Sequence, residues 1–100
     1  MGAYLKAGLL ELQEKYPIIG DVRGMGLLLA IELVEDRRTK APAAAATLQL
    51  IEAARENRIL VGRGGLYGNV VRLSPPMNIA RTDVDEFIRR LDASLGQIAP

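Results

Sequence analysis

Lysines and carboxylates are the side chains from which this sequence would have to build catalysis. The 100 residues include no histidine and no cysteine, so there is no imidazole base, no thiolate nucleophile and no conventional zinc site. Lys6 and Lys15 fall off the apolar stripe of a predicted helix, and Lys40 falls in a charged loop. Because a Schiff-base lysine is normally desolvated, we interpret all three as solvated and assign no catalytic, cofactor-binding or metal-binding residue.

The adjacent carboxylates Glu35 and Asp36 are followed directly by Arg37 and Arg38. Two carboxylates that act as the acid and the base of one reaction need different surroundings, and both must reach the reacting group. Four consecutive charges are instead typical of a surface turn, and we assign these residues no chemistry.

The segment 62–69 contains four glycines in eight residues and is predicted to be a loop. Such a loop can bring backbone amides close to an anion. It does not begin a helix and lacks a Lys-Ser or Lys-Thr ending, so neither a P-loop nor a dinucleotide fingerprint is present. A plain connection between strands is therefore favoured, with Tyr67 either a ligand contact or a cover for the sheet.

Arg72 presents the sharpest chemical question. In a strand, alternation places Val71 and Leu73 on one side and Arg72 with Val70 on the other, so the guanidinium is expected among apolar neighbours. A buried cation needs an anion. Three interpretations stay open: a structural ion pair, an exposed sheet edge, or a clamp that holds a ligand carboxylate through two hydrogen bonds. For Arg23 we favour a structural pair.

Three amphipathic helices are expected to position these residues. The first covers 3–16, where large apolar residues recur at helical spacing until Pro17. The second runs from Pro42, in its first turn, to Asn57 as its C-terminal cap. The third begins with a capping pair formed by Thr82 and Asp85 and ends at Gly96. Their predicted buried stripes are Leu5, Leu9, Leu12 and Tyr16; Ala44, Leu48, Ile51 and Ala54; and Val84, Ile88, Leu91 and Leu95.

Strands are predicted at 27–34, 59–61 and 70–73, the first of them covered on both faces. Pro75 and Pro76 lack amide donors, so the last strand ends near Leu73 or Ser74. The order helix, strand, helix, strand, strand, helix predicts an α+β domain. Its sheet is small, largely antiparallel and three-stranded, with the helices on one face.

Length and composition predict one soluble domain over residues 1–100. A net charge of +1 gives no field that would attract nucleic acid or an anionic membrane. The longest apolar run covers 27–31 and is far shorter than the roughly 20 residues that span a bilayer. We expect neither a nucleic-acid nor a membrane partner.

Three segments together resemble one known family. They are PIIGDVRGMGL at 17–27, GRGG at 62–65 and NVVRLSPPM at 69–77. In this order they are similar to the C-terminal segment of class III pyridoxal-phosphate aminotransferases. The stretch LVGRG at 60–64 is similar in form to the alanine–glyoxylate aminotransferase 2-like branch.

The resemblance implies the C-terminal small domain of a transferase with the type I pyridoxal-phosphate fold, normally a homodimer. It implies that the cofactor domain, with its Schiff-base lysine, lies upstream and outside these residues. Of the family's functional residues only Arg72 carries over, as the group that binds the α-carboxylate of the substrate. The reaction implied is amino transfer from an amino acid to a keto acid or aldehyde such as pyruvate or glyoxylate.

On this interpretation the chain is a fragment of a longer enzyme that uses pyridoxal 5'-phosphate. Alone it is expected to be inactive and to hold no cofactor. The location expected is cytoplasmic, or the mitochondrial matrix if a leader lies upstream. The alternative is a stand-alone module that binds amino acids or a partner without catalysis, since a helix-covered antiparallel sheet hosts many functions.

Overall fold

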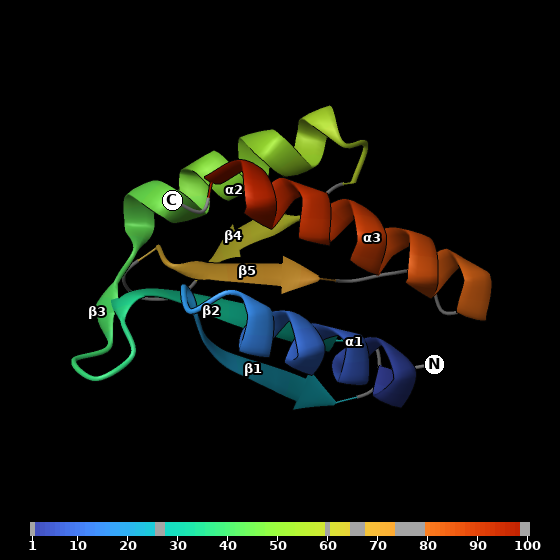
Figure 1. Ribbon diagram of the computed structural model, residues 1–100, viewed down its shortest axis with the longest axis horizontal. Coiled ribbons are helices and arrows are strands. Elements are labelled where there is room, and N and C mark those ends of the chain that lie inside the picture. Colours follow the sequence, from blue (N-terminus) through green and yellow to red (C-terminus); the bar gives the residue numbers. More distant parts are fainter. Residues whose placement is uncertain (1, 26–27, 60, 65–67, 74–79, 99–100) are drawn as a thin grey trace.

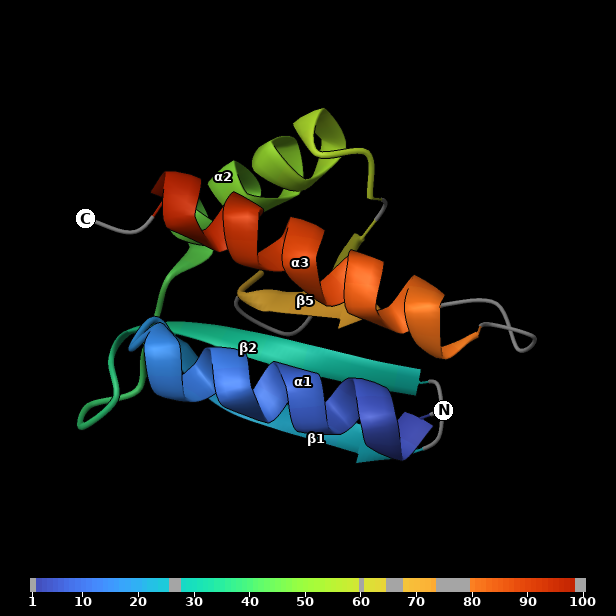
Figure 2. The same cartoon turned by 45° about the vertical axis from the view of Figure 1, so that its right-hand side comes forward.

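A computed structural model describes residues 2–25, 28–59, 61–64, 68–73 and 80–98. Three helices lie on one side of an antiparallel sheet (Figures 1 and 2). The predicted α+β class is therefore confirmed. The elements are α1 (Gly2–Lys15), β1 (Ile19–Met25), β2 (Leu28–Asp36), β3 (Ala41–Pro42), α2 (Ala44–Glu56), β4 (Gly62–Gly64), β5 (Val70–Leu73) and α3 (Arg81–Ile98).

The sheet has the strand order β1-β2-β5-β4, and β3 pairs with the end of β2. All of these pairs are antiparallel. The prediction of three strands was too low, because β1 carries two glycines and two charges and was not recognised as a strand. The strand predicted at 59–61 was wrong in position, because Ile59 and Val61 are not in a strand and β4 begins at Gly62. Leu27 and Leu60 lie outside the described residues.

Alternation along the strands separates a buried sheet face from an open one. Val22, Ile31 and Val71 pair across three strands and are buried beneath the helices. Their neighbours Ala30 and Glu32 point to the other side and are half-buried. The prediction that β2 is covered on both faces was therefore wrong, since all three helices lie on the same side (Figure 2).

Helix α1 agrees with its prediction, as all four residues of the expected stripe are buried. Helix α3 buries three of its four predicted residues, and Ile88 is half-buried. Its start differs, because Asp83 Oδ2 accepts the Ala80 amide at 3.1 Å in place of the expected Thr82 cap. Gly96 lies inside α3 rather than at its end.

Helix α2 buries a different stripe from the one predicted. Thr47 and Leu50 are fully buried, whereas Leu48 is 51% exposed. Ala54 is buried as predicted. The rest of the predicted stripe lies one residue too far along the chain, because five alanines in the segment give apolar periodicity at several phases. Pro42 ends β3 instead of opening the helix, and Asn57 is the C-terminal cap as predicted.

Side chains at the end of α1 tie this helix to α3. Lys15 Nζ lies 2.9 Å from Asp92 Oδ2, and Tyr16 Oη also donates to the Asp92 carboxylate. Partial burial alone would raise the pKa of Asp92, but the hydrogen bonds from Tyr16 and Lys15 outweigh it and hold that pKa below its ordinary value. None of the described helices is both long and apolar enough to cross a membrane.

The Asp92 contact predicts a loss of stability in acid. Because the folded pKa of Asp92 is lowered, its contribution is complete above the ordinary carboxyl pKa of about 3.9 and is lost as pH falls through the folded value. Urea unfolding between pH 6 and pH 3 is expected to show this loss in the native sequence. Asp92→Asn should be less stable at pH 6, by less than about 1 kcal/mol because the pair is partly exposed, and should lose less on acidification.

Glu14→Gln is the matched control for this comparison. Glu14 is an exposed carboxylate of α1 with no ion pair to the described residues. It should retain the acid-dependent loss of the native sequence. Equal acid loss in the native protein and Asp92→Asn would contradict the role given to Asp92.

Candidate functional site

The open face of the sheet, opposite the helices, carries two rows of residues that pair across four strands. Strand register places Arg23, Ala30, Arg72 and Gly62 in one row. The second row, two residues along each strand, contains Asp21, Glu32, Val70 and Gly64. This face therefore gathers the charges of β1, β2 and β5 and the glycines of β4.

Arg72 is the one exposed residue of β5, whose three other residues are buried. Its cross-strand neighbours, Ala30 and Gly62, carry no polar side chain, as expected, but the expected burial of the guanidinium was wrong because Arg72 is exposed. The edge interpretation also fails, since β4 lies outside β5. Within the described residues no carboxylate lies within salt-bridge distance of Arg72. Its recorded contact is Nη2 donating to the Arg63 carbonyl at 3.2 Å.

A guanidinium has five N–H donors. Among the described residues, Arg72 uses one of its two terminal nitrogens in one hydrogen bond, so most of its N–H groups can bind a ligand. Two parallel N–H groups match the two oxygens of a carboxylate. The exposed position allows a ligand to approach from the open face. Arg72 thus has the chemistry of an anion-binding group.

The glycines of β4 lie beside this side chain, at different distances from it. Gly62 and Gly64 flank Arg63, and both face the Arg72 guanidinium. A Cβ at position 64 would lie 3.2 Å from Arg72 Nε, while one at position 62 would lie 3.6 Å from Nη2. Sequence reasoning assigned both glycines to a loop and missed the close approach of Arg72 to position 64. Glycine within a strand pattern signals that another group approaches the backbone closely.

Asn69 fixes the start of β5. Its side chain is buried and donates from Nδ2 to the Leu33 carbonyl at 3.0 Å. Its own carbonyl accepts the Leu33 amide at 2.8 Å. These two bonds hold the chain against β2 just before the strand, so the register that aims Arg72 at the open face is set locally.

Arg23 forms the predicted structural pair. Its Nη1 lies 2.7 Å from Glu32 Oε2 and 3.2 Å from Asp21 Oδ2. The hydrogen bond to Glu32 raises the pKa of Arg23, with a smaller contribution from Asp21. Its charge is thus neutralised by neighbours on the open face, and Arg72 differs from it in this respect.

The lysines make no hydrogen bond or ion pair with Arg72 within the described residues. Lys6 donates to the Gly24 carbonyl at 3.3 Å, and Lys15 belongs to the Asp92 contact. Lys40 is exposed in the turn after β2, with a φ of 58°. The turn itself agrees with prediction, since Asp36 Oδ1 accepts the Arg38 amide at 2.7 Å. Tyr67 and the segment 74–79 lie outside the described residues.

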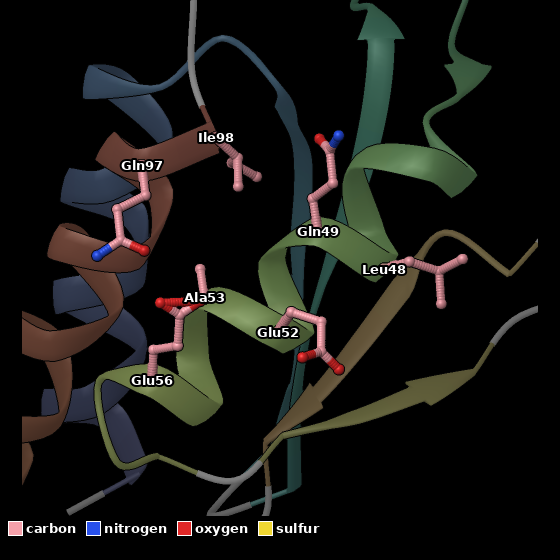
Figure 3. Close-up of a pocket in the computed structure, with 7 residues that line it drawn as sticks. All are labelled: Leu48, Gln49, Glu52, Ala53, Glu56, Gln97 and Ile98. Carbon is pink, nitrogen blue, oxygen red and sulfur yellow. The ribbon is translucent and has the colours of Figure 1, made fainter.

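A cavity of about 530 Å³ lies between α2 and the end of α3 (Figure 3). Its polar side chains are Gln49, Glu52, Glu56 and Gln97. Its described lining residues include two carboxylates and no cation, so they do not suit an anionic ligand. A larger groove of about 840 Å³ includes Lys15 and Arg37. Both cations are engaged within the chain, Lys15 with Asp92 and Arg37 with backbone carbonyls at the end of α1.

The family model for class III aminotransferases matches residues 1–95. The chain therefore belongs to the class III aminotransferase family. It is 45% identical over 98 residues to alanine–glyoxylate aminotransferase 2 homolog 2, mitochondrial, of Arabidopsis thaliana, which covers 98% of this chain and 20% of that protein.

Solved structures agree with this assignment. An aminotransferase of Bacillus anthracis superposes with a TM-score of 0.91 at 33% identity, over 97% of this chain and 23% of its own. An amine transaminase from an uncultivated Pseudomonas species, in its PLP-bound form, gives 0.86 at 35% identity, over 98% and 22%. The chain thus spans about a fifth of the length of these proteins.

The residues of this chain do not fit the role of a pyridoxal-phosphate anchor. All three lysines of the sequence are described, and two of them are engaged in contacts with Gly24 and Asp92. The third, Lys40, stands exposed on a turn. A lysine that forms a Schiff base is desolvated or placed beside another cation. Lys6 and Lys15 instead lie against oxygen atoms, and Lys40 is exposed although it lines a small pocket with Arg37.

We expect the isolated chain to retain no pyridoxal phosphate. After incubation with the cofactor and dialysis, its visible absorbance should match that of an unrelated protein with the same number of lysines. The reason is the solvated or engaged state of Lys6, Lys15 and Lys40. A band that survives dialysis and is bleached by an amino donor would contradict this expectation.

Proposed function

We propose that residues 1–100 form the C-terminal small domain of a longer aminotransferase, in which Arg72 binds the α-carboxylate of the amino donor. The observation that carries the proposal is the exposed guanidinium on the open face, held over β4 with no carboxylate partner among the described residues. Membership of the class III family supports the domain assignment, as does the fact that the chain spans about a fifth of the length of its relatives.

The complete enzyme would use pyridoxal 5'-phosphate as its amino-group carrier, anchored by residues outside this chain. The contribution of this chain is binding and orientation. Two N–H groups of Arg72 would hold the donor carboxylate and so fix the direction of its amino group. Arg72 would transfer no proton, because a guanidinium stays charged at any working pH.

The substrates proposed are an amino acid and a keto acid or aldehyde of the pyruvate or glyoxylate type. The name of the Arabidopsis relative, alanine–glyoxylate aminotransferase, supports this class. A homodimer is proposed because the family normally acts as one. We propose a cytoplasmic enzyme, or a mitochondrial one if the longer chain carries a leader, as the name of that relative suggests.

Substitution of Arg72 by alanine in the complete enzyme should discriminate between donors. L-Alanine carries the carboxylate, and isopropylamine replaces it with a methyl group. Loss of charge-assisted hydrogen bonds should lower kcat/KM for L-alanine by about 10- to 100-fold. The value for isopropylamine should change little.

Arg38→Ala removes the same charge from an exposed turn and is the matched control. It should leave both donors unaffected. An equal loss for the two donors in Arg72→Ala would make Arg72 a structural residue and would remove the proposed role.

The native polypeptide that contains this sequence is expected to be about four to five times its length, an expectation supported by the shares of 20% and 23% that it covers in its relatives. An antibody raised against the chain, followed by mass determination of the protein captured from the source cells, measures this. A product of only 100 residues would contradict the domain assignment. The stand-alone amino-acid-binding module would then be the better interpretation.

A further inference from the structure

Two glycines of β4 stand in nearly equivalent positions beside Arg72, but they leave it different amounts of room. Both lie on the open face, one paired with Arg72 itself and the other with Val70. An added Cβ at position 62 would meet Arg72 atoms at 3.6 and 3.7 Å, which is ordinary van der Waals contact. At position 64 it would meet Nε at 3.2 Å and Cδ at 3.4 Å.

We propose that Gly64 is a positioning residue for Arg72: the missing side chain at 64 lets the guanidinium lie across β4 in the orientation that receives a carboxylate. This inference rests on the proposed function of Arg72. It adds that donor preference is set partly by a residue that itself touches no substrate.

The contact at position 64 involves the stem of the arginine rather than its tip. The position of Cδ relative to the β5 backbone is set by two torsions and that of Nε by three, so these atoms yield less readily than the end of the side chain. An alanine at 64 would push the stem away from β4 and take Nη2 from the Arg63 carbonyl, 3.2 Å away. The guanidinium would then be free to sample other rotamers.

Backbone strain does not complicate the substitution. Positive φ values occur at Gly24 and Gly68 but not at Gly62 or Gly64, so alanine is compatible with the backbone at both positions of β4. The two substitutions also have the same effect on the unfolded chain. Any difference between them therefore reports the room available to Arg72.

A held guanidinium binds better than a mobile one, because less side-chain freedom is lost when the carboxylate arrives. It also fixes the donor in one direction, which supports the reaction beyond simple binding. Donors without a carboxylate gain neither benefit. The position of Arg72 over β4 thus favours amino acids over simple amines.

The test compares Gly64→Ala and Gly62→Ala in the complete enzyme, each with L-alanine and with isopropylamine. Gly64→Ala should lower kcat/KM for L-alanine by about tenfold, the loss expected when a charge-assisted hydrogen bond is weakened. Its value for isopropylamine should stay within about twofold of the unsubstituted enzyme. Gly62→Ala should stay within about twofold for both donors.

The same measurement in an Arg72→Ala background separates positioning from a structural role. If Gly64 acts through Arg72, Gly64→Ala should have no further donor-selective effect once the guanidinium is gone. An equal loss with both donors, or a loss that persists in the Arg72→Ala background, would overturn the inference. Equal losses in Gly62→Ala and Gly64→Ala would overturn it as well.

Crystal structures test the positioning role of Gly64 independently of the proposed function, because they show where the Arg72 guanidinium lies. In the unsubstituted enzyme the Arg72 guanidinium should lie over Gly64, and a guanidinium directed away from β4 would overturn the inference even if Gly64→Ala failed to fold. In Gly64→Ala it should leave the Arg63 carbonyl. A further outcome is that Arg72→Ala lowers kcat/KM equally for L-alanine and isopropylamine while the crystal structure of Gly64→Ala still shows the displaced guanidinium. In that case the proposed function fails and the positioning role of Gly64 stands.

Discussion

The pairing of β5 between β2 and β4 is the constraint on which the site depends. Val71 and Leu73 are buried against the helices, and this burial determines which side chains of β5 point to the core and which to the open face. A shift of one residue would expose both and turn Arg72 into the core, where an unpaired charge is costly. The hydrogen bonds between Asn69 and Leu33 act in the same direction. Core packing therefore decides where the candidate ligand group points.

The one-sided arrangement of the helices explains the distribution of charge. An antiparallel sheet remains stable with one face open, provided that the open face carries polar residues. Here Arg23 is paired with Glu32 and Asp21, so this part of the face balances its own charge. Arg72 is bonded to a backbone carbonyl, which leaves its charge uncompensated by the described residues. Two arginines of one row thus differ in role because of what lies beside each.

The sequence predicted well those elements whose periodicity has a single interpretation. Leu5, Leu9 and Leu12 define one face of α1, and the alternation at 70–73 defines β5. Prediction failed where the pattern was weak or degenerate. Alanines made several phases of α2 look equivalent, glycines made β4 look like a loop, and β1, with its glycines and charges, was not recognised as a strand. Those strands are stabilised by pairing with β2 and β5, which local sequence does not reveal.

The candidate site shows the same division between side chain and surroundings. Arg72 could be found from sequence because a cation in an apolar strand violates a local rule. Gly64 could not, because its contribution is an empty volume that exists only when β4 lies beside β5. The useful signal was the glycine–x–glycine spacing next to a strand that presents an arginine: a period of two puts both glycines on one face. Where a strand with this spacing pairs with a strand that bears a long charged side chain, the glycines indicate where that side chain lies.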